Sequence, residues 1–321
     1  MSKGIIVIAQ NNSTDNYVKQ SALLAMSLQV YNNIPISIVT NNSVPDEYIK
    51  LFDQIIPIPF NDSAEQSEWK IENRWKLYHA SPYDETIVMD TDMLVLQNID
   101  TWWKFLSNYE MFFVSKVLNY RGEYADTSYY RKTFLDNNLP NLFSGFHYFK
   151  KCEFAQEFYA WLELVVNNWE TFYEQHLNAA SRPKHVSIDV CAAIVTRILD
   201  CEAAITNKNS KFPSFTHMKS HCQGWKQVQT SWQDRIGVYR GTCGMIAGLP
   251  YEPVSSWHDS LKWLDENWES FFFWGLHIST DKDTNTQSDF TVDAEKYGYT
   301  QATSPEVLAW AEKNGYNDFT K

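Results

Sequence analysis

Two aspartates separated by one residue follow an apolar run in the first third of the chain. The apolar residues 87–89 lead directly into Asp90, Thr91 and Asp92. Two carboxylates on the turn that leaves a buried strand can converge on one divalent cation. Carboxylate oxygens are hard ligands that suit Mg²⁺ or Mn²⁺, and such cations bridge phosphate oxygens. The pattern therefore predicts that Asp90 and Asp92 hold Mn²⁺ or Mg²⁺ together with a phosphate-bearing ligand.

Around this turn, short apolar runs alternate with segments of helical spacing. The apolar runs predict strands at residues 5–9, 36–40, 54–58, 86–89, 111–116, 145–150 and 214–218. Helical spacing predicts helices at residues 15–31, 45–52, 69–80, 152–169, 188–199, 257–273 and 305–313. This alternation predicts an α/β fold with a mostly parallel sheet flanked by helices. In such sheets ligands bind at the carboxyl ends of the strands, which is where Asp90 and Asp92 fall.

The composition is that of a folded protein with a large core. The chain has 321 residues, of which 44% are hydrophobic, and this excludes global disorder. No apolar run approaches the ~18 residues of a membrane span, and the first eight residues do not make a signal peptide. The five cysteines are odd in number and form no C-x-x-C pair, so we expect free thiols. These features predict a cytoplasmic protein without a membrane span.

Charge is distributed unevenly along the chain. The formal net charge of -12 disfavours nonspecific binding of nucleic acid. Residues 182–240 nevertheless contain nine basic side chains against four acidic ones, whereas residues 252–321 contain five against thirteen. The middle of the chain therefore suits a phosphate-bearing ligand, and the C-terminal part is acidic and rich in Trp.

The residues after the apolar run carry a resemblance to a known family. The segment 90–100 reads DTDMLVLQNID. It resembles the stretch D-x-D-x-x-V-x-x-N-I-D of the glycogenin-like retaining glycosyltransferases of glycosyltransferase family 8, which have the GT-A fold. The N-terminal segment 14–28 is similar to the loop and helix with which these enzymes contact the nucleotide. The resemblance implies nucleotide contacts from Ala9, Asn11 and Tyr17. It also places Arg74, sixteen residues before Asp90, where the family has a basic residue that touches the sugar-nucleotide.

The family's third metal ligand is a His in an H-x7-W segment, which resembles His217 and Trp225 here. The resemblance implies that His217 completes the metal site with Asp90 and Asp92. His221 is a rival ligand close by in the sequence. Its spacing to Trp225 and its position at the end of a predicted strand favour His217.

The same segment departs from the family motif, which is written H-x-x-G-x-x-K-P-W. Ser220, Gln223 and Gly224 stand where the motif has Gly, Lys and Pro. Lys219 or Lys226 is the candidate for the missing cation on the diphosphate. The backbone at Gly224 remains a candidate contact to the nucleotide.

Two further family landmarks are only partly matched. The N-S-G strand reads Phe143, Ser144, Gly145, and the D-Q motif reads Asp189, Val190. The resemblance implies that Asp189 lies near the reacting sugar, and a helix N-cap is the alternative role for this residue.

Together, the resemblance implies a hexosyl- or pentosyl-transferase that moves a sugar from a nucleotide-sugar, a UDP-sugar, to a hydroxyl acceptor with retention. A cation held by Asp90, Asp92 and His217 would neutralise the departing diphosphate. Arg74 would add fixed positive charge, and Asp90 and Thr91 would also contact the nucleotide. Residues 1–248 are expected to form the GT-A catalytic domain. Residues 249–321 are expected to form a mainly helical extension on the acceptor side.

Other functions remain open at this point. A haloacid-dehalogenase-type phosphohydrolase also has Asp-x-Asp after a strand, although its motif usually lies on the first strand. A GT-A protein that binds carbohydrate with weak or no turnover would explain the lost Asn at Phe143 and the lost Lys at Gln223. The acceptor could be a saccharide, a lipid-linked sugar, a protein hydroxyl or, less in keeping with the charge, a hydroxymethylated DNA base.

Overall fold

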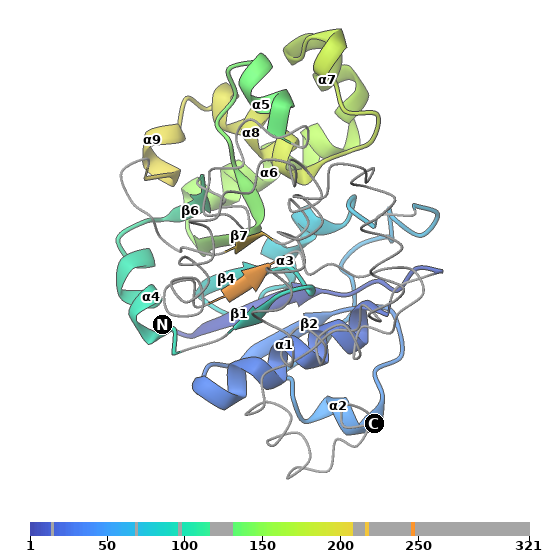
Figure 1. Cartoon of the computed structure of the whole chain (residues 1–321), viewed down its shortest axis with the longest axis vertical. Coiled ribbons are helices and arrows are strands. Elements are labelled where there is room, and N and C mark those ends of the chain that lie inside the picture. The colour runs from blue at the N-terminus through green and yellow to red at the C-terminus, as the bar shows by residue number, and fades with distance from the viewer. Residues whose placement is uncertain are drawn as a thin grey trace, which may run out of the picture.

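The apolar runs form a six-stranded sheet with the order β3-β2-β1-β4-β7-β6 (Figure 1). The computed structural model describes residues 1–13, 16–67, 70–95, 98–115, 131–207, 216–217 and 245–247. The strands of this sheet are β1 Lys3–Ile8, β2 Ile36–Val39, β3 Ile55–Ile56, β4 Glu85–Met89, β6 Met111–Val114 and β7 Phe143–Lys150. Strands β1, β2, β3 and β4 run parallel, and β7 runs antiparallel to β4 and to β6. The predicted α/β class with a mostly parallel sheet is confirmed.

The register of the central strands brings their carboxyl ends to one edge of the sheet. Ile5 of β1 pairs with Ile36 of β2 and with Ile87 of β4. Residues of β2 and β4 are buried throughout, as expected for parallel strands that are covered on both faces. The loop after β1 and the turn after β4 therefore emerge side by side.

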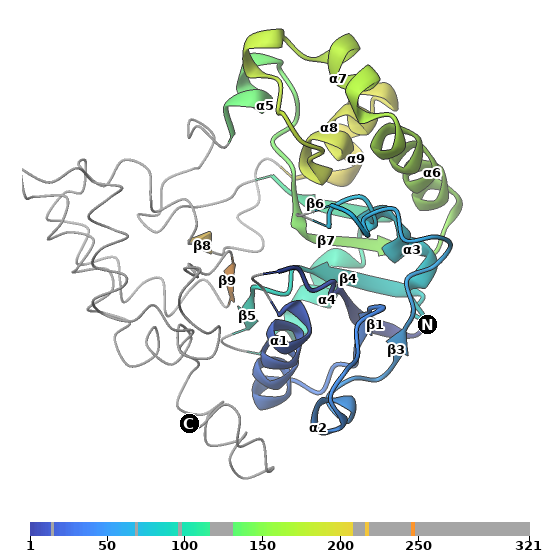
Figure 2. The same ribbon diagram turned by 90° about the vertical axis from the view of Figure 1, so that its right-hand side faces the viewer.

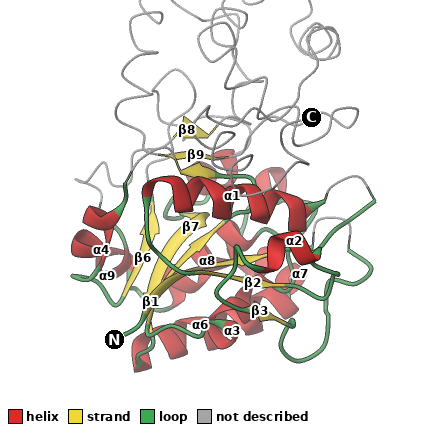
Figure 3. Ribbon diagram, turned by 90° about the horizontal axis from the view of Figure 1, so that it is seen from below, coloured by secondary structure: helices red, strands yellow, loops and turns green. Residues whose placement is uncertain are grey.

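Helices cover both faces of the sheet. The helices are α1 Tyr17–Tyr31, α2 Asp46–Ile49, α3 Leu77–Ala80, α4 Asp100–Leu106, α5 Lys132–Asp136, α6 Glu153–Asn167, α7 Trp169–His176, α8 Ile188–Ile198 and α9 Glu202–Ile205. Figures 2 and 3 show α1 on one face and α6 and α8 on the other. On the α6 face, Phe113 and Phe149 pack with Phe158 in one buried cluster. On the opposite face, Trp102 of α4 packs edge-on against Phe146 at 5.4 Å between ring centroids.

A second, three-stranded sheet has the order β5-β9-β8. Its strands are β5 Leu94–Val95, β9 Met245–Ala247 and β8 Thr216–His217. β5 follows the Asp90–Asp92 turn directly, so this small sheet ties distant parts of the chain to that turn. The backbone amide of Val95 donates to Ser27 Oγ at 3.1 Å, which fixes β5 to α1.

The predicted helix at 69–80 is wrong in its first half. The described part of this segment is a turn followed by a 3-10 helix, Arg74–Lys76, and the four-residue α3. Asn73 and Lys76 are fully buried and bond to the loop after β3, and these tertiary contacts override the helical spacing. The predicted helices at 257–273 and 305–313, and the boundary between 248 and 249, lie outside the described residues.

Among the described helices, none combines the length and the apolarity that crossing a membrane requires.

Candidate functional site

The turn after β4 is held in place by the neighbouring strand β7 and by helix α1. The backbone N–H of Asp90 donates to the carbonyl oxygen of Gly145 at 2.8 Å, which extends the β4–β7 ladder by one residue. The hydroxyl of Thr91 donates to Oε1 of Gln20 at 2.9 Å, and Gln20 lies buried on α1. Thr91, predicted to contact the nucleotide, is itself buried and anchors the turn to α1.

Arg74 and Asp90 form an ion pair between Nη2 and Oδ1. Their side chains keep 17% and 24% of their surface exposed, so the pair lies at the edge of the sheet in contact with solvent. Asp92 is 7% exposed and lies on the same turn. The structure thus brings the side chains of Arg74 and Asp90 together, and Asp92 lies two residues further along the same turn.

Gly145 of β7 lies directly against the carboxylate of Asp90. A Cβ atom at position 145 would come within 2.5 Å of Oδ2 of Asp90 and within 2.5 Å of the ring of Phe143. Real Cβ atoms essentially never approach that closely. The absence of a side chain at this position therefore lets the Asp90 carboxylate lie against the strand.

The predicted nucleotide contacts Ala9, Asn11 and Tyr17 lie in the loop after β1 and at the start of α1. Ala9 is buried, and its amide donates to the carbonyl of Val39 at 2.9 Å. Asn11 is half-buried; its amide donates to Asn42 Oδ1 at 2.8 Å, and its own Oδ1 accepts the amide of Val18 at 3.1 Å. Tyr17 is half-buried at the first position of α1. These three residues lie at the same edge of the sheet as Asp90, at the carboxyl end of the neighbouring strand.

A buried polar network holds Asn73, the residue that precedes Arg74. This network was not predicted from the sequence. Asn73 donates to Gln10 Oε1 at 2.8 Å and to Asp62 Oδ1 at 2.6 Å, and Gln10 donates to Asp62 Oδ2 at 2.9 Å. The ammonium of Lys76 donates to Asn73 Oδ1 at 2.6 Å and to the carbonyl of Asn61. The network joins the end of β1 to the loop after β3 and to the 3-10 helix that carries Arg74.

Burial and polar partners shift the pKa values of the two charged side chains in this network, Lys76 and Asp62. Burial lowers the pKa of Lys76, while the charge of Asp62 opposes that shift. Burial by itself raises the pKa of Asp62, but hydrogen bonds from Asn73 and Gln10 bring the pKa below its ordinary value. The network therefore holds an ionised carboxylate beside the turn of Arg74.

Asp189 lies in the first turn of α8 and is bound on both of its oxygens. The amide of Ser144 donates to Oδ1 at 2.8 Å, and the hydroxyl of Ser144 donates to the same atom. Nη1 of Arg131, which is fully buried, lies 3.0 Å from Oδ2. The N-cap of α8 is Ser187, so the alternative that Asp189 is a helix N-cap is wrong.

His147 of β7 lies three residues after Ser144, which binds Asp189, and it was not predicted as a site residue. Nδ1 lies 2.7 Å from the carbonyl oxygen of Ser144, and Nε2 lies 2.7 Å from the hydroxyl of Tyr159 on α6. Burial lowers the pKa of His147 to about 4, and the charges of Arg74 and Asp189 both act on the ring. The sequence signal that could have found it is a lone His inside an otherwise apolar strand.

The predicted third metal ligand, His217, is described through its backbone pairing. β8 pairs His217 with Ala247 of β9, and β9 pairs Ile246 with Leu94 of β5. Because β9 is antiparallel to β5, Ala247 lies on the side of Leu94 that leads back to Asp92. The backbone of His217 thus lies two strands, about 10 Å, from the end of the turn. The described side chains form no cluster of three or more metal-binding groups.

Three predicted nucleotide contacts, Lys219, Gly224 and Lys226, lie outside the described residues. The rival ligand His221 and the motif residue Trp225 lie there too.

Two of the positions that depart from the family motif, Phe143 and Val190, are buried. Phe143 and Val190 are each 3% exposed, and Val190 belongs to the cluster under α6 and α8. In this chain these two side chains contribute to the core.

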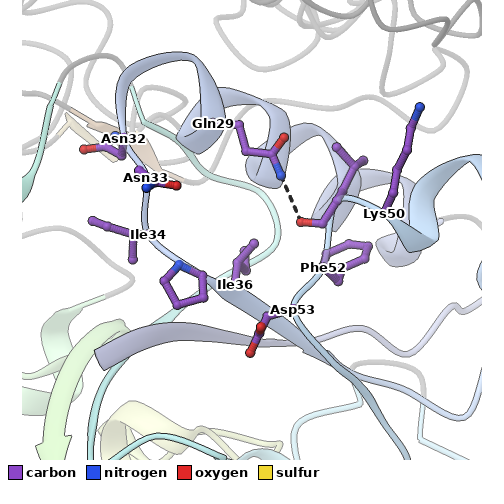
Figure 4. Close-up of a pocket in the computed structure, with 10 residues that line it drawn as sticks. Gln29, Asn32, Asn33, Ile34, Ile36, Lys50, Phe52 and Asp53 are labelled. Carbon is purple, nitrogen blue, oxygen red and sulfur yellow. Dashed lines mark hydrogen bonds between the residues drawn. The ribbon is translucent and has the colours of Figure 1, made fainter. Parts of the chain in front are cut away.

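A surface pocket of about 640 Å³ lies at the opposite edge of the sheet (Figure 4). It is lined by the end of α1, the amino end of β2 and residues 50–53, with Gln29 donating to the carbonyl of Leu51 at 3.1 Å. Lys50 and Asp53 are both exposed at this pocket, so their opposite charges favour neither an anion nor a cation. The pocket is separate from the Asp90–Asp92 turn, because the turn follows the carboxyl end of β4.

No protein-family model matches the sequence, and no curated protein matches it. Among solved structures, the chain is similar to mouse xyloside xylosyltransferase 1 in its apo form, with 9% identity, a TM-score of 0.47, and coverage of 77% of this chain and 98% of that one. It is similar to the galactosyltransferase LgtC in complex with donor and acceptor sugar analogs, with 12% identity, a TM-score of 0.46, and coverage of 76% and 86%. It is also similar to apo GlyE, a glycosyltransferase in Streptococcus pneumoniae TIGR4, with 10% identity, a TM-score of 0.45, and coverage of 93% and 65%. These three neighbours are glycosyltransferases.

Proposed function

We propose that this chain is a metal-dependent GT-A glycosyltransferase that moves a hexosyl or pentosyl group from a UDP-sugar to a hydroxyl acceptor with retention. The donor nucleotide, the retention and the family rest on the resemblance of the segment 90–100 to glycogenin-like enzymes. The metal is Mn²⁺ or Mg²⁺.

The arrangement of Asp90, Asp92 and Arg74 beside the loop after β1 is the observation that carries this proposal. The carboxylate of Asp90 and the guanidinium of Arg74 meet at the carboxyl edge of a parallel sheet, with Asp92 on the same turn. Such an edge is where α/β proteins bind ligands. The guanidinium suits a diphosphate, because its fixed fork of N–H groups matches phosphate oxygens. The loop with Ala9, Asn11 and Tyr17 lies next to them and offers polar groups to a base and ribose.

The donor set of the turn fits a hard divalent cation. Asp90 and Asp92 supply carboxylate oxygens from one turn, and His217 lies on the strand that leads towards it. When bound there, Mn²⁺ or Mg²⁺ supplies charge neutralisation to the departing diphosphate. Arg74 binds the diphosphate and keeps positive charge beside it, with Lys219 or Lys226 as the second cation.

The acceptor side of the site is proposed to include Asp189 and the acidic extension, residues 249–321. Asp189 keeps its carboxylate within a frame made by Ser144 and Arg131. A saccharide acceptor suits the Trp-rich composition, because Trp faces stack on pyranose rings. The net charge of -12 makes a DNA base the weaker choice.

Release of UDP from a panel of UDP-sugars tests this function. The wild-type protein is assayed with Mn²⁺, with Mg²⁺ and with EDTA, alongside Asp92→Asn and a control, Asp46→Asn, which changes an exposed carboxylate on α2. We expect UDP release that requires the metal and is lost by at least about a hundredfold in Asp92→Asn only. Turnover that is equal in EDTA, or equal in Asp92→Asn, contradicts the proposal. Release of inorganic phosphate from phosphate esters without any UDP-sugar would favour a phosphohydrolase instead.

A second function, carbohydrate binding with little or no turnover, is favoured by one observation. Phe143 and Val190 replace polar motif residues and are buried in the core. Binding of UDP-sugar with Mn²⁺ in the absence of any UDP release would select this alternative.

A further inference from the structure

Strand β7 leaves its register with β6 beside the candidate site. His147 pairs with Phe113, but the next residue of β6, Val114, pairs with Phe143. Three residues of β7, at positions 144–146, therefore have no partner on β6. A bulge of this kind re-aims the backbone and side chains of a strand, and bulges are frequent next to active sites.

The side chain of His147 closes this bulge. Its Nδ1 lies 2.7 Å from the carbonyl oxygen of Ser144, three residues earlier. Its ring stacks on Phe113 of β6, with 4.8 Å between centroids and 6° between planes. The imidazole thus links the last residue of β7 that pairs regularly with β6 to the first residue of the bulge.

The partners of His147 fix its protonation and tautomer. A carbonyl oxygen only accepts, so Nδ1 carries the hydrogen and donates to Ser144. A neutral ring then accepts at Nε2 from the hydroxyl of Tyr159. Burial raises the pKa of Tyr159, so this hydroxyl keeps its proton. Both hydrogen bonds of the imidazole are satisfied in one orientation.

Residues of the bulge contact both Asp90 and Asp189. The proposed function places Asp90 on the metal side of the site and Asp189 on the sugar side. Ser144 donates from its amide and its hydroxyl to Oδ1 of Asp189. The carbonyl of Gly145 accepts the amide of Asp90, and the missing side chain of Gly145 leaves room for the Asp90 carboxylate. One short segment therefore sets the distance between the metal side and the sugar side of the site.

We propose that His147 is a positioning residue which, by donating to the carbonyl of Ser144, holds the bulge at 144–146 and thereby the relative placement of Asp90 and Asp189. His147 does not touch the substrate, since it is 6% exposed and both of its nitrogens are used. This inference rests on the proposed function for its kinetic consequence, but the placement of the bulge can be measured without turnover.

Four variants separate positioning from stability. His147→Leu removes both hydrogen bonds, whereas the amide of His147→Asn keeps a donor at the place of Nδ1. Tyr159→Phe removes the hydroxyl from Nε2 and leaves the bond to Ser144. His185→Leu, an exposed histidine outside the site, is the matched control.

With UDP-sugar and Mn²⁺, we expect His147→Leu to lower kcat by roughly tenfold to a hundredfold, because small misplacements of reacting groups are costly. The donor KM should stay within about threefold, since ground-state binding is kept. His147→Asn should recover most of kcat, and Tyr159→Phe should lose less than His147→Leu. Unchanged kcat in His147→Leu, or a loss that His147→Asn does not relieve, overturns the inference.

Two further measurements need no turnover. Nitrogen-15 NMR of labelled histidine should show His147 neutral with its proton on Nδ1 at pH 7 in the wild-type protein. Hydrogen exchange at the amide of Asp90 should accelerate in His147→Leu and remain at the wild-type rate in His147→Asn and in His185→Leu. If the wild-type protein turns over no UDP-sugar, the proposed function fails and Asp90 exchange alone decides. Equal exchange in His147→Leu and wild type overturns the positioning role.

Discussion

Arg74 and Asp90 are paired at the carboxyl edge of the sheet, although the proposed function assigns them to opposite partners. Asp90 is a proposed ligand of a cation, and Arg74 is a proposed contact of the diphosphate. In the structure the guanidinium of Arg74 forms an ion pair with the carboxylate of Asp90. The two groups neutralise each other in this pair. Under the proposed function, each group would exchange its partner for another of opposite charge when the metal and the diphosphate bind.

Arg74→Ala should therefore change metal binding and turnover in opposite directions. Removing a cation beside Asp90 should tighten the binding of Mn²⁺ alone by roughly threefold to tenfold. UDP-sugar turnover should fall by about a hundredfold to a thousandfold, since a charge on the diphosphate is lost. Calorimetric titration with Mn²⁺ and a UDP-release assay measure the two effects. Weaker Mn²⁺ binding in Arg74→Ala would show that the pair supports the metal site rather than competing with it.

Gly145→Ala should disturb the metal site through contact with Asp90. The added Cβ meets Oδ2 of Asp90 and the ring of Phe143, so we expect a stability loss of about 1–3 kcal/mol and weaker Mn²⁺ binding. Gly4→Ala is the matched control, because its Cβ would meet the ring of Tyr83 at the other end of the sheet. Urea unfolding should show destabilisation in both variants, and Mn²⁺ titration should differ from wild type only in Gly145→Ala. Equal Mn²⁺ affinities in the two variants would show that the space left by Gly145 does not matter for the metal site.

His217→Ala should weaken Mn²⁺ binding more than His221→Ala does. β8 brings the backbone of His217 to the side of the small sheet that leads back to Asp92. We expect the Mn²⁺ dissociation constant to rise by at least about tenfold in His217→Ala. Electron paramagnetic resonance of free Mn²⁺ in a titration gives both constants. The reverse ranking would assign the third ligand to His221.

Acid should destabilise the wild-type protein more than His147→Asn. The folded pKa of His147 is about 4, below the ordinary value of 6.5, so the unfolded chain binds more protons between these pH values. The free energy of unfolding should therefore fall by up to about 3 kcal/mol as the pH is lowered from about 6.5 to about 4. Urea unfolding at several pH values should show a smaller fall in His147→Asn. If the free energies of unfolding of the two proteins fall in parallel as the pH is lowered, the group that titrates is not His147.

The sheet and the position of its candidate site could be predicted from the sequence, because both depend on short-range patterns. Strands β1 and β4 are continuous apolar runs, and the Asp90–Asp92 turn follows β4 directly in the chain. The parallel part of the sheet, β1 to β4, follows from the alternation of strands with helices.

The side-chain networks could not be predicted, because each member alone has the character of a surface residue. Lys76 is a charged residue within a helical pattern, yet it is fully buried against Asn73 and the loop after β3. Arg131 and Asp189 are far apart in sequence and meet only after α8 packs against β7. Their pairing depends on tertiary contacts that spacing along the chain does not encode.

Asp92, a proposed metal ligand, is 7% exposed. Asp92→Ala would therefore combine a lost ligand with a lost buried group. Asp92→Asn keeps the shape of the side chain and is the sharper variant.

An anomalous difference map from crystals soaked with Mn²⁺ and UDP tests the central claim most directly. We predict one Mn²⁺ peak within ligand distance, about 2.0–2.3 Å, of carboxylate oxygens of Asp90 or Asp92 and of a ring nitrogen of His217. The same peak should contact oxygens of both phosphates. A peak bound to the diphosphate but remote from Asp90 and Asp92, or UDP seated away from the carboxyl ends of β1 and β4, would contradict the account.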